Sequence, residues 1–159
     1  MNNFDDLFEQ QPQKEAALQK PEGQKERPKR QWWQIREEKQ RKEAYASLDK
    51  IFGAFAEGNG NMEAYLDVQS RFPFHSARNA LLIGAQCPQA QRVGGYKEWT
   101  AQGIEILEEE KRLPIIILEP GKAYRRDDGS IGQNFYAKEV YDISQTSAQG
   151  QYQPQVTYD

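Results

Sequence analysis

The stretch Pro114-Ile115-Ile116-Ile117-Leu118-Glu119-Pro120 marks the point where the sequence changes from a helical to an extended pattern. A short apolar run bounded by prolines predicts a buried strand. Residues 135–143 are again rich in β-branched and aromatic side chains and predict the partner strand. Residues 121–133, which contain Asp127-Asp128-Gly129, are expected to form a long hairpin loop between the two strands.

Upstream of this strand pair, apolar residues recur at helical spacing. Ser76 is a good N-cap and Gly103 is a good C-terminal stop, whereas Gly94-Gly95 is expected to be a flexible turn. Helices are expected over residues 32–56, 62–70, 77–86 and 96–102. Three to four helices followed by a small antiparallel β-sheet (a hairpin) predict an α+β fold.

The apolar residues are unevenly distributed along the chain of 159 residues. Residues 1–30 are rich in Gln, Lys, Glu and Pro and hold little to bury, so we expect a disordered charged arm there. Residues 31–146 are long enough for one domain. Residues 147–159 are Gln-rich and are expected to be a flexible tail.

The formal net charge of −3 limits the ways in which the chain can bind an anionic partner. Phosphate attraction is screened within about 10 Å at moderate salt, so a nucleic-acid footprint must be a local basic patch. A single cysteine, Cys87, is compatible with a reducing compartment. The N-terminus lacks a secretory pattern and the apolar runs are too short to cross a bilayer, so we expect a cytoplasmic protein without membrane association.

Catalytic constellations are not apparent in the sequence. His75 is the only histidine, and with Cys87 it leaves too few ligands for a zinc site. The two residues stand near opposite ends of one expected helix, about 18 Å apart at 1.5 Å per residue, which is too far for proton transfer. The acidic runs 108–110 and 127–128 are typical of solvated faces. We therefore expect a non-enzymatic protein with no metal and no cofactor.

Two segments carry signs of recognition. Residues 20–42 hold nine Lys and Arg against four Glu, and Trp32-Trp33 follows a basic cluster, so this segment either contacts phosphates and bases or packs its tryptophans on the domain. Asn79 and Gln86 lie seven apart on one helix face, where they either tie down neighbouring segments or face a groove. Further along, cations and aromatics interleave at Arg92, Tyr96, Lys97 and Trp99, although Trp99 suits the core equally well.

The order of these motifs resembles a known family. Residues 74–83 (FHSARNALLI) lead into Gln86-Cys87-Pro88, then residues 90–99 (AQRVGGYKEW), the strand ending at Pro120, and residues 141–146 (YDISQT). Over about residues 45–146 this resembles the N-terminal single-stranded-DNA-binding domain of ArdC-type antirestriction proteins, which conjugative plasmids and integrative elements encode. One departure is that the basic glycine-containing turn of the family is replaced by Glu108–Pro114, where three acids stand before Lys111 and Arg112. Full-length members often continue into a metalloprotease-like domain, which this chain does not contain, so proteolysis is not implied.

The resemblance implies that the chain binds single-stranded DNA in a groove between the helices at 77–86 and 96–102 and the strand pair. The residues expected to contact DNA are Phe74, Ser76, Arg78, Asn79, Arg92, Tyr96, Lys97, Trp99, Lys111, Arg112 and Gln145. The alternative is a protein-interaction module with an acidic binding surface and no direct DNA binding. In either case the N-terminal arm is a possible contact for a protein partner.

Overall fold

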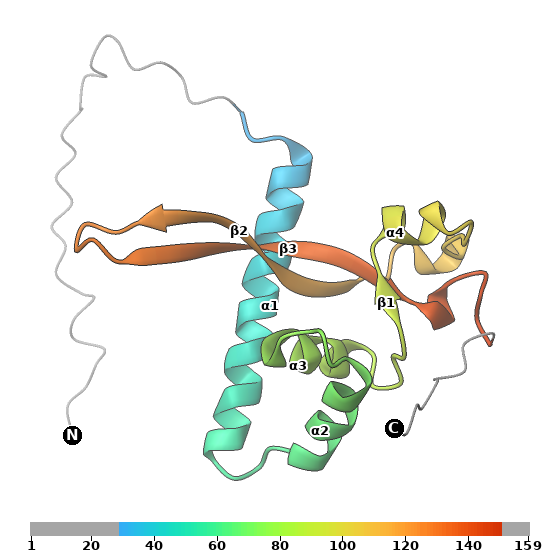
Figure 1. Cartoon of the computed structure of the whole chain (residues 1–159), viewed down its shortest axis with the longest axis horizontal. Coiled ribbons are helices and arrows are strands. Elements are labelled where there is room, and N and C mark those ends of the chain that lie inside the picture. Colours follow the sequence, from blue (N-terminus) through green and yellow to red (C-terminus); the bar gives the residue numbers. More distant parts are fainter. Residues whose placement is uncertain (1–28, 151–159) are drawn as a thin grey trace, which may run out of the picture.

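Four helices and a three-stranded sheet make up the fold (Figure 1), which confirms the predicted α+β class. The structure is a computed structural model that describes residues 29–150. The elements are α1 (Trp32–Ala56), α2 (Met62–Arg71), α3 (Ala77–Gln86), β1 (Val93–Gly94), α4 (Tyr96–Ala101), the 3₁₀ turn η2 (Glu108–Glu110), β2 (Ile115–Arg125), β3 (Ile131–Asp142) and the 3₁₀ turn η3 (Ile143–Gln145).

The sheet is antiparallel with the order β1-β3-β2. Two predictions were wrong here. Residues 121–133, expected to be a loop, are mostly strand, closed by a tight turn in which Gly129 has a φ of +86°. Gly94, expected to be a flexible turn, pairs with Tyr141 in β1. A Cβ at Gly94 would lie 3.2 Å from the Trp99 indole nitrogen, so a close packing contact accounts for that glycine.

The hydrophobic core lies on both faces of the sheet because side chains alternate along β2. Ile115 and Ile117 face a cluster built with α2 and α3, in which Val68, Phe72 and Ile83 are buried. The opposite face of β2 packs against α1 and α3 through Ala44, Leu48, Leu82 and Leu118. A third cluster fixes α4 and the chain after it to the end of β3 through Trp99, Ile106, Tyr141, Ile143 and Ala148.

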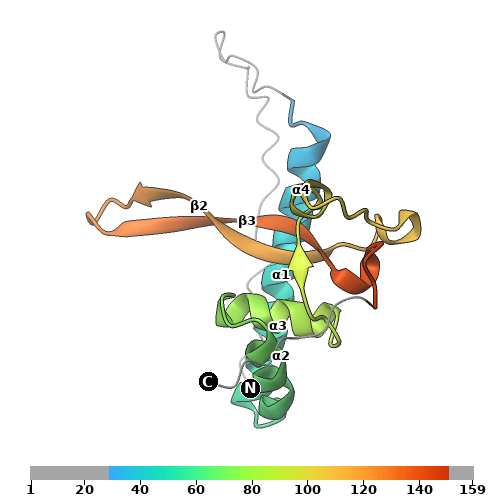
Figure 2. The ribbon, with the colours of Figure 1, turned by 45° about the vertical axis from the view of Figure 1, so that its right-hand side comes forward.

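Helix α1 runs across β2 and β3, and its N-terminal half extends past them (Figures 1 and 2). Ala44, at the middle of α1, and Leu48, in its C-terminal half, are its only buried residues. Ile35, which the helical pattern places on the apolar face, is 55% exposed. The first three turns of α1 therefore stand outside the core.

The outer parts of β2 and β3 form a two-stranded ribbon that projects away from the helices (Figures 1 and 2). Nearly every residue from Pro120 to Asn134 is exposed, with Gly132 as the exception. Gly132 is covered by a neighbouring ring, because a Cβ there would lie 2.3 Å from the Tyr124 side chain. We call residues 120–135 the ribbon.

The C-terminal boundary differs from the prediction. Ser147, expected to begin the tail, accepts a hydrogen bond from the Glu105 amide at 3.0 Å, and Ala148 is buried. The folded part therefore continues past residue 146. Residues 1–28 of the predicted arm and residues 151–159 of the predicted tail lie outside the described residues. None of the helices within residues 29–150 has the length and apolar composition needed to span a membrane.

Candidate nucleic-acid interface

Asn79 and Gln86 join α3 to the outer edge of β2. The Asn79 amide donates to the Leu118 carbonyl at 2.9 Å and accepts from the Leu118 N–H at 3.0 Å. Gln86 makes the same pair of bonds with Ile116, at 2.8 and 2.9 Å. We call these four bonds the amide seam. Because β2 is an edge strand, these amides occupy the positions that a further strand would take.

The amide seam decides between the two interpretations of these residues. Asn79 is buried and both polar atoms of its side chain bond to Leu118, so the fold already uses the groups that were expected to contact DNA. The helix spacing identified a shared face correctly. What the spacing alone leaves open is whether that face meets a strand edge or solvent.

Trp99 and Gln145 were also expected to contact DNA, and both serve the fold instead. Trp99 is 1% exposed and its indole N–H donates to the Tyr141 carbonyl at 2.9 Å, so no base can stack on it. The Gln145 amide accepts from the Asp142 N–H at 2.9 Å and donates to the Leu113 carbonyl at 2.7 Å. These contacts join α4 and the segment before β2 to the C-terminal end of β3, beside the third core cluster.

Three of the expected cations are engaged within the fold. The Arg78 guanidinium lies 4.4 Å from the centre of the Phe135 ring, and the Arg92 guanidinium lies 5.0 Å from that of Trp99. The Lys111 ammonium pairs with Glu108 at 2.7 Å, and this hydrogen bond raises the pKa of Lys111 and lowers that of Glu108. Of these three cations, Lys111 is ion-paired, whereas Arg78 and Arg92 lie over rings and keep their charge.

The remaining predicted contacts are exposed but do not form one basic surface. Ser76 caps α3 by accepting from the Asn79 N–H at 3.2 Å. Phe74 is fully exposed, and Tyr96, Lys97 and Arg112 are exposed too. Residues 96–112 contain three Lys and Arg against five Glu, so their net charge is −2.

A hollow beside α4 illustrates this acidic character. Tyr96 and Lys111 line it together with Glu105 and Glu108, in a space of about 350 Å³. Carboxylates at such a site oppose the approach of phosphate groups. The groove expected between α3, α4 and the strands is therefore a poor candidate for a DNA interface.

A different surface brings exposed rings and cations together. Trp33 of α1 and Tyr136 of β3 line one hollow of about 470 Å³, together with Arg30, Gln34, Glu37, Glu38 and Arg41. We call these seven residues the tryptophan hollow. Trp33 is 56% exposed and the adjacent Trp32 is 71% exposed. The rings come from segments about 100 residues apart in the sequence.

Polar contacts between α1 and β3 fix the helix beside the hollow. The Arg36 guanidinium pairs with Glu139 at 2.6 Å, and Gln40 donates to the same carboxylate at 2.7 Å. Glu37 accepts from the Ala137 N–H at 2.9 Å. Polar bonds thus anchor a helix segment that has no buried side chain of its own, and they leave its tryptophans facing solvent.

Tyr136 is oriented by a polar cluster at the base of the ribbon. Its hydroxyl donates to Glu119 at 2.8 Å, and the Lys138 ammonium lies 2.9 Å from Glu119 and 2.8 Å from Glu98. Although burial acts in the opposite direction, hydrogen bonds from Lys138 and Tyr136 hold the pKa of Glu119 below its ordinary value. The Tyr136 ring is therefore presented in a defined direction beside Trp33.

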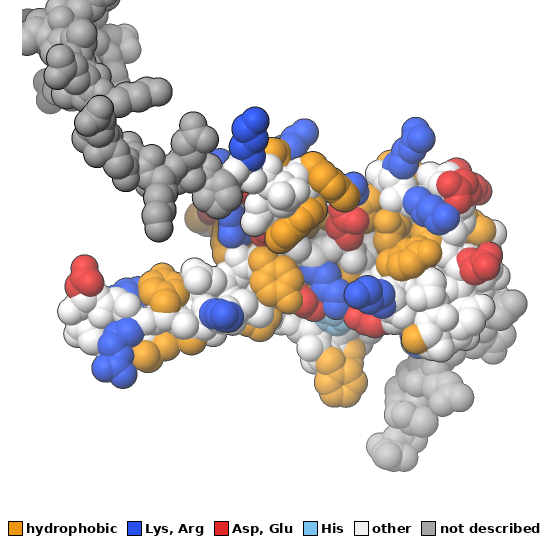
Figure 3. All heavy atoms as spheres, turned by 90° about the horizontal axis from the view of Figure 1, so that it is seen from above, with side chains coloured by type: hydrophobic (Ala, Val, Ile, Leu, Met, Phe, Trp, Pro, Cys, Tyr) orange, Lys and Arg blue, Asp and Glu red, His pale blue; other side chains and the backbone are white. Residues whose placement is uncertain are grey.

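The segment around the tryptophan hollow is more basic than the segment around α4, although the hollow itself is lined by two Arg and two Glu, which pair as Arg30 with Glu38 and Arg41 with Glu37. Residues 29–42 contain six Lys and Arg against two Glu, a net charge of +4. Hydrogen bonding from Lys42 and the charge of Arg30 lower the pKa of Glu38, so this acid stays ionised and locally neutralised. In Figure 3, hydrophobic and charged side chains interleave over the meeting point of α1 and the ribbon.

The sequence carried a signal for this surface in Trp32-Trp33 beside the basic cluster. The alternative that both tryptophans pack on the domain was wrong, because both side chains are mostly exposed. No sequence pattern marked Tyr136 as a site residue, since its approach to Trp33 depends on how α1 crosses β3.

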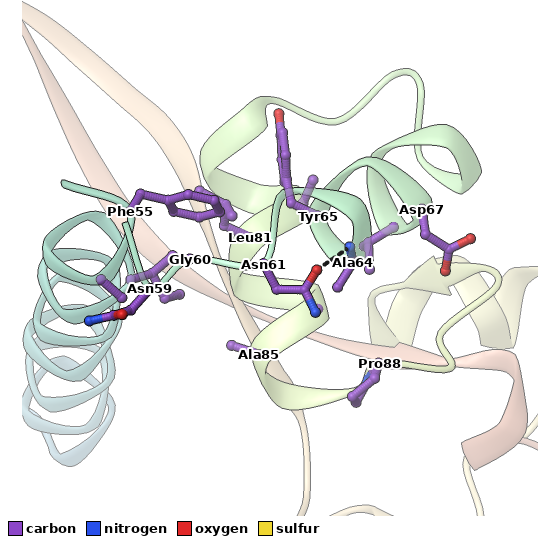
Figure 4. A pocket seen from close by; sticks show the side chains of 15 residues that line it. Phe55, Asn59, Gly60, Asn61, Ala64, Tyr65, Asp67, Leu81, Ala85 and Pro88 are labelled. Carbon is purple, nitrogen blue, oxygen red and sulfur yellow. Dashed lines mark hydrogen bonds between the residues drawn. The ribbon is translucent and has the colours of Figure 1, made fainter. Parts of the chain in front are cut away.

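A further pocket lies between the C-terminal end of α1, α2 and α3 (Figure 4). It has a volume of about 420 Å³, and Phe55, Tyr65 and Leu81 are its large residues. Asp67 is the only charged residue that lines it, so it offers nothing to a phosphate backbone. Within residues 29–150, no group of three His, Cys, Asp or Glu side chains is placed to hold a metal ion.

Comparisons of the chain with models of known protein families, with curated proteins and with solved structures find no match. The chemistry of the surface is therefore the basis for proposing a function.

Proposed function

We propose that this protein binds single-stranded DNA at the tryptophan hollow and does not act as an enzyme. The observation that carries the proposal is the exposure of Trp33 and Tyr136 around one hollow, which Arg30 and Arg41 also line in ion pairs with Glu38 and Glu37. Rings beside cations suit an unpaired strand, because exposed bases stack on rings while phosphates pair with Lys or Arg.

Each part of the hollow has a role in the proposal. Trp33 and Tyr136 are stacking surfaces, and Trp32 offers a third ring one residue away. Lys29 neutralises a phosphate at the start of α1, and Arg30 does so by exchanging Glu38 for a phosphate. The oxygen of the Gln34 amide accepts from the Gln31 N–H at 2.9 Å, which leaves its NH₂ group to donate to a base edge. Base stacking on a ring contributes about 1–3 kcal/mol per base, which is enough for useful affinity with two or three rings.

The resemblance to ArdC-type proteins supports DNA as the strand and a role in the transfer of a mobile element such as a conjugative plasmid. In this proposal the antirestriction-like module protects or escorts an unpaired strand. The binding surface proposed here differs from the groove that the resemblance implies, because the residues of that groove are used by the fold.

The alternative function, a protein-interaction module, is favoured by one specific observation. Glu105 and Glu108 line the hollow beside Tyr96, and this acidic surface fits a cationic segment of a partner protein. Under this alternative the chain does not bind DNA. The contacts with such a partner would lie around α4 and not around α1.

Fluorescence anisotropy with a labelled oligo(dT) of 20 nucleotides separates the two functions. We expect binding at low salt and an affinity that falls as salt rises. Trp33→Ala with Tyr136→Ala should weaken binding at least tenfold, whereas Tyr96→Ala with Lys97→Ala should leave it within about twofold. Absence of binding by the wild type at low salt would favour the protein-interaction module.

A further inference from the structure

Among the residues that the structure describes, the ribbon packs against no other element except at its base. Both of its faces are exposed from Pro120 to Asn134 apart from Gly132, and α3 covers the edge of β2 only at Ile116 and Leu118. An isolated two-stranded hairpin is marginally stable in water. A ribbon that projects in this way (Figure 2) is therefore suited to contact another molecule.

The ribbon is continuous with the tryptophan hollow. Tyr136 lines the hollow, and the preceding residues of β3 lead directly outward into the ribbon. Five or six strand residues span about 17–20 Å, so the tip lies well beyond the hollow. A single DNA strand bound at Trp33 and Tyr136 would therefore pass close to the base of the ribbon.

The shape and the charges of the ribbon fit duplex DNA. The major groove is about 12 Å wide and admits a two-stranded ribbon. Lys122 and Arg125 are exposed, and within residues 29–150 neither side chain takes part in an ion pair. Arg126 lies 5.6 Å from the Tyr124 ring centre and donates to the Ile131 carbonyl at 3.1 Å.

The acidic residues of the ribbon are confined to its turn. Asp128 accepts from the Ser130 N–H at 2.9 Å and from the Ser130 hydroxyl at 2.6 Å, so it shapes the turn. Asp127 precedes it. In a groove, the turn faces base edges, where a carboxylate can accept from cytosine, and the cations along the strands lie nearer the phosphates.

We infer that the ribbon enters the major groove of a duplex that adjoins the bound single strand, so that the preferred ligand is a junction between single-stranded and duplex DNA. This inference rests on the proposed function, because the hollow supplies the site for the unpaired strand. Lys122 and Arg125 contact phosphates, and Tyr124 and Ile131 offer apolar contact to base edges.

The test compares three ligands by anisotropy: oligo(dT) of 20 nucleotides, a blunt duplex, and the same duplex with an oligo(dT) overhang. We expect the wild type to bind the overhang duplex at least tenfold more tightly than oligo(dT). Lys122→Ala with Arg125→Ala should reduce that preference to less than threefold and leave oligo(dT) affinity unchanged. Lys97→Ala with Arg112→Ala is the matched control and should keep the preference.

The outcomes distinguish the two proposals. Equal affinity for oligo(dT) and the overhang duplex, or a preference that survives Lys122→Ala with Arg125→Ala, overturns the ribbon inference and leaves the proposed function standing. Failure of the wild type to bind oligo(dT) overturns the proposed function and the junction inference with it. Thermal unfolding of each variant, expected to match the wild type, excludes misfolding as the cause.

Discussion

The amide seam and the tryptophan hollow use similar residue types for opposite purposes. At the amide seam, the side-chain amides of Asn79 and Gln86 form hydrogen bonds with the backbone of β2. At the tryptophan hollow, polar bonds from Glu37 and Gln40 hold α1 in place while Trp33 stays exposed. A polar or aromatic residue in a sequence motif thus indicates ligand binding only if its side chain is exposed and not already bonded within the fold.

The tryptophans give the largest expected contrast between interior and surface. Trp99→Ala should lower the free energy of unfolding by about 3–5 kcal/mol, because it empties a buried site and leaves the Tyr141 carbonyl unpaired. Trp33→Ala should change it by less than about 0.5 kcal/mol, since its side chain is largely exposed. Urea denaturation followed by circular dichroism measures both. Equal destabilisation by the two substitutions would contradict the assignment of Trp33 to the surface.

The amide seam should show the next largest effect. Asn79→Ala removes two hydrogen bonds and leaves the buried N–H and carbonyl of Leu118 unpaired, so we expect a loss of about 2–4 kcal/mol. Gln86→Ala should cost about 1 kcal/mol, because Gln86 is exposed and water can replace its bonds. The same denaturation measurement applies. If Asn79→Ala left stability intact and abolished DNA binding, the seam would be a recognition site after all.

Within the ribbon, Gly132→Ala tests the packing of Tyr124. The new Cβ would lie 2.3 Å from the ring, so the ring must move away. We expect a loss of about 1 kcal/mol or less, because the ribbon lies outside the core, and a changed Tyr124 signal in NMR. Gly121→Ala is the matched control, since its Cβ would meet its neighbours at an ordinary 3.5 Å. An unmoved Tyr124 ring in Gly132→Ala would show that the two residues do not pack together.

The smallest effect concerns pH. Burial lowers the pKa of His75 in the folded state, while Glu98 acts in the opposite direction. The unfolded chain then binds more protons, so stability should fall as pH drops below about 6.5. We expect a contribution under about 0.5 kcal/mol, because the ring is only partly buried and solvent screens it. Thermal unfolding at pH 7 and pH 5 should show a smaller decrease for His75→Gln than for the wild type. A larger decrease in the variant would contradict this sign.

The sequence predicted the helices well because each has a strong local signal. The bounds of α1 and α3 match the prediction, and Ser76 and Gly103 act as expected at their helix ends. The ribbon was missed because both of its faces are exposed, so no alternation of apolar and polar residues marks it. The extension of the fold to Ala148 was missed for a related reason, since one small buried residue gives no periodic pattern.

The candidate site was predicted less well, and the reason is physical. Asn79, Trp99 and Gln145 have the chemistry of DNA contacts, yet their partners include backbone groups that lie 32 to 42 residues away in the sequence. Only the three-dimensional arrangement reveals those partners. In the same way, Tyr136 joins Trp33 through a crossing of α1 over β3 that no local pattern encodes.

Intrinsic tryptophan fluorescence provides the most direct measurement of the central claim, because Trp32 and Trp33 are exposed and Trp99 is buried. Titration with oligo(dT) should quench the wild type and Trp99→Phe to a similar extent, provided that this variant folds, through bases stacked on the exposed pair. Trp32→Phe with Trp33→Phe should lose the quenching, although the remaining Trp99 still fluoresces. Quenching that persists in the double variant, or none in the wild type at saturating DNA, would contradict the claim that an unpaired strand lies on this surface.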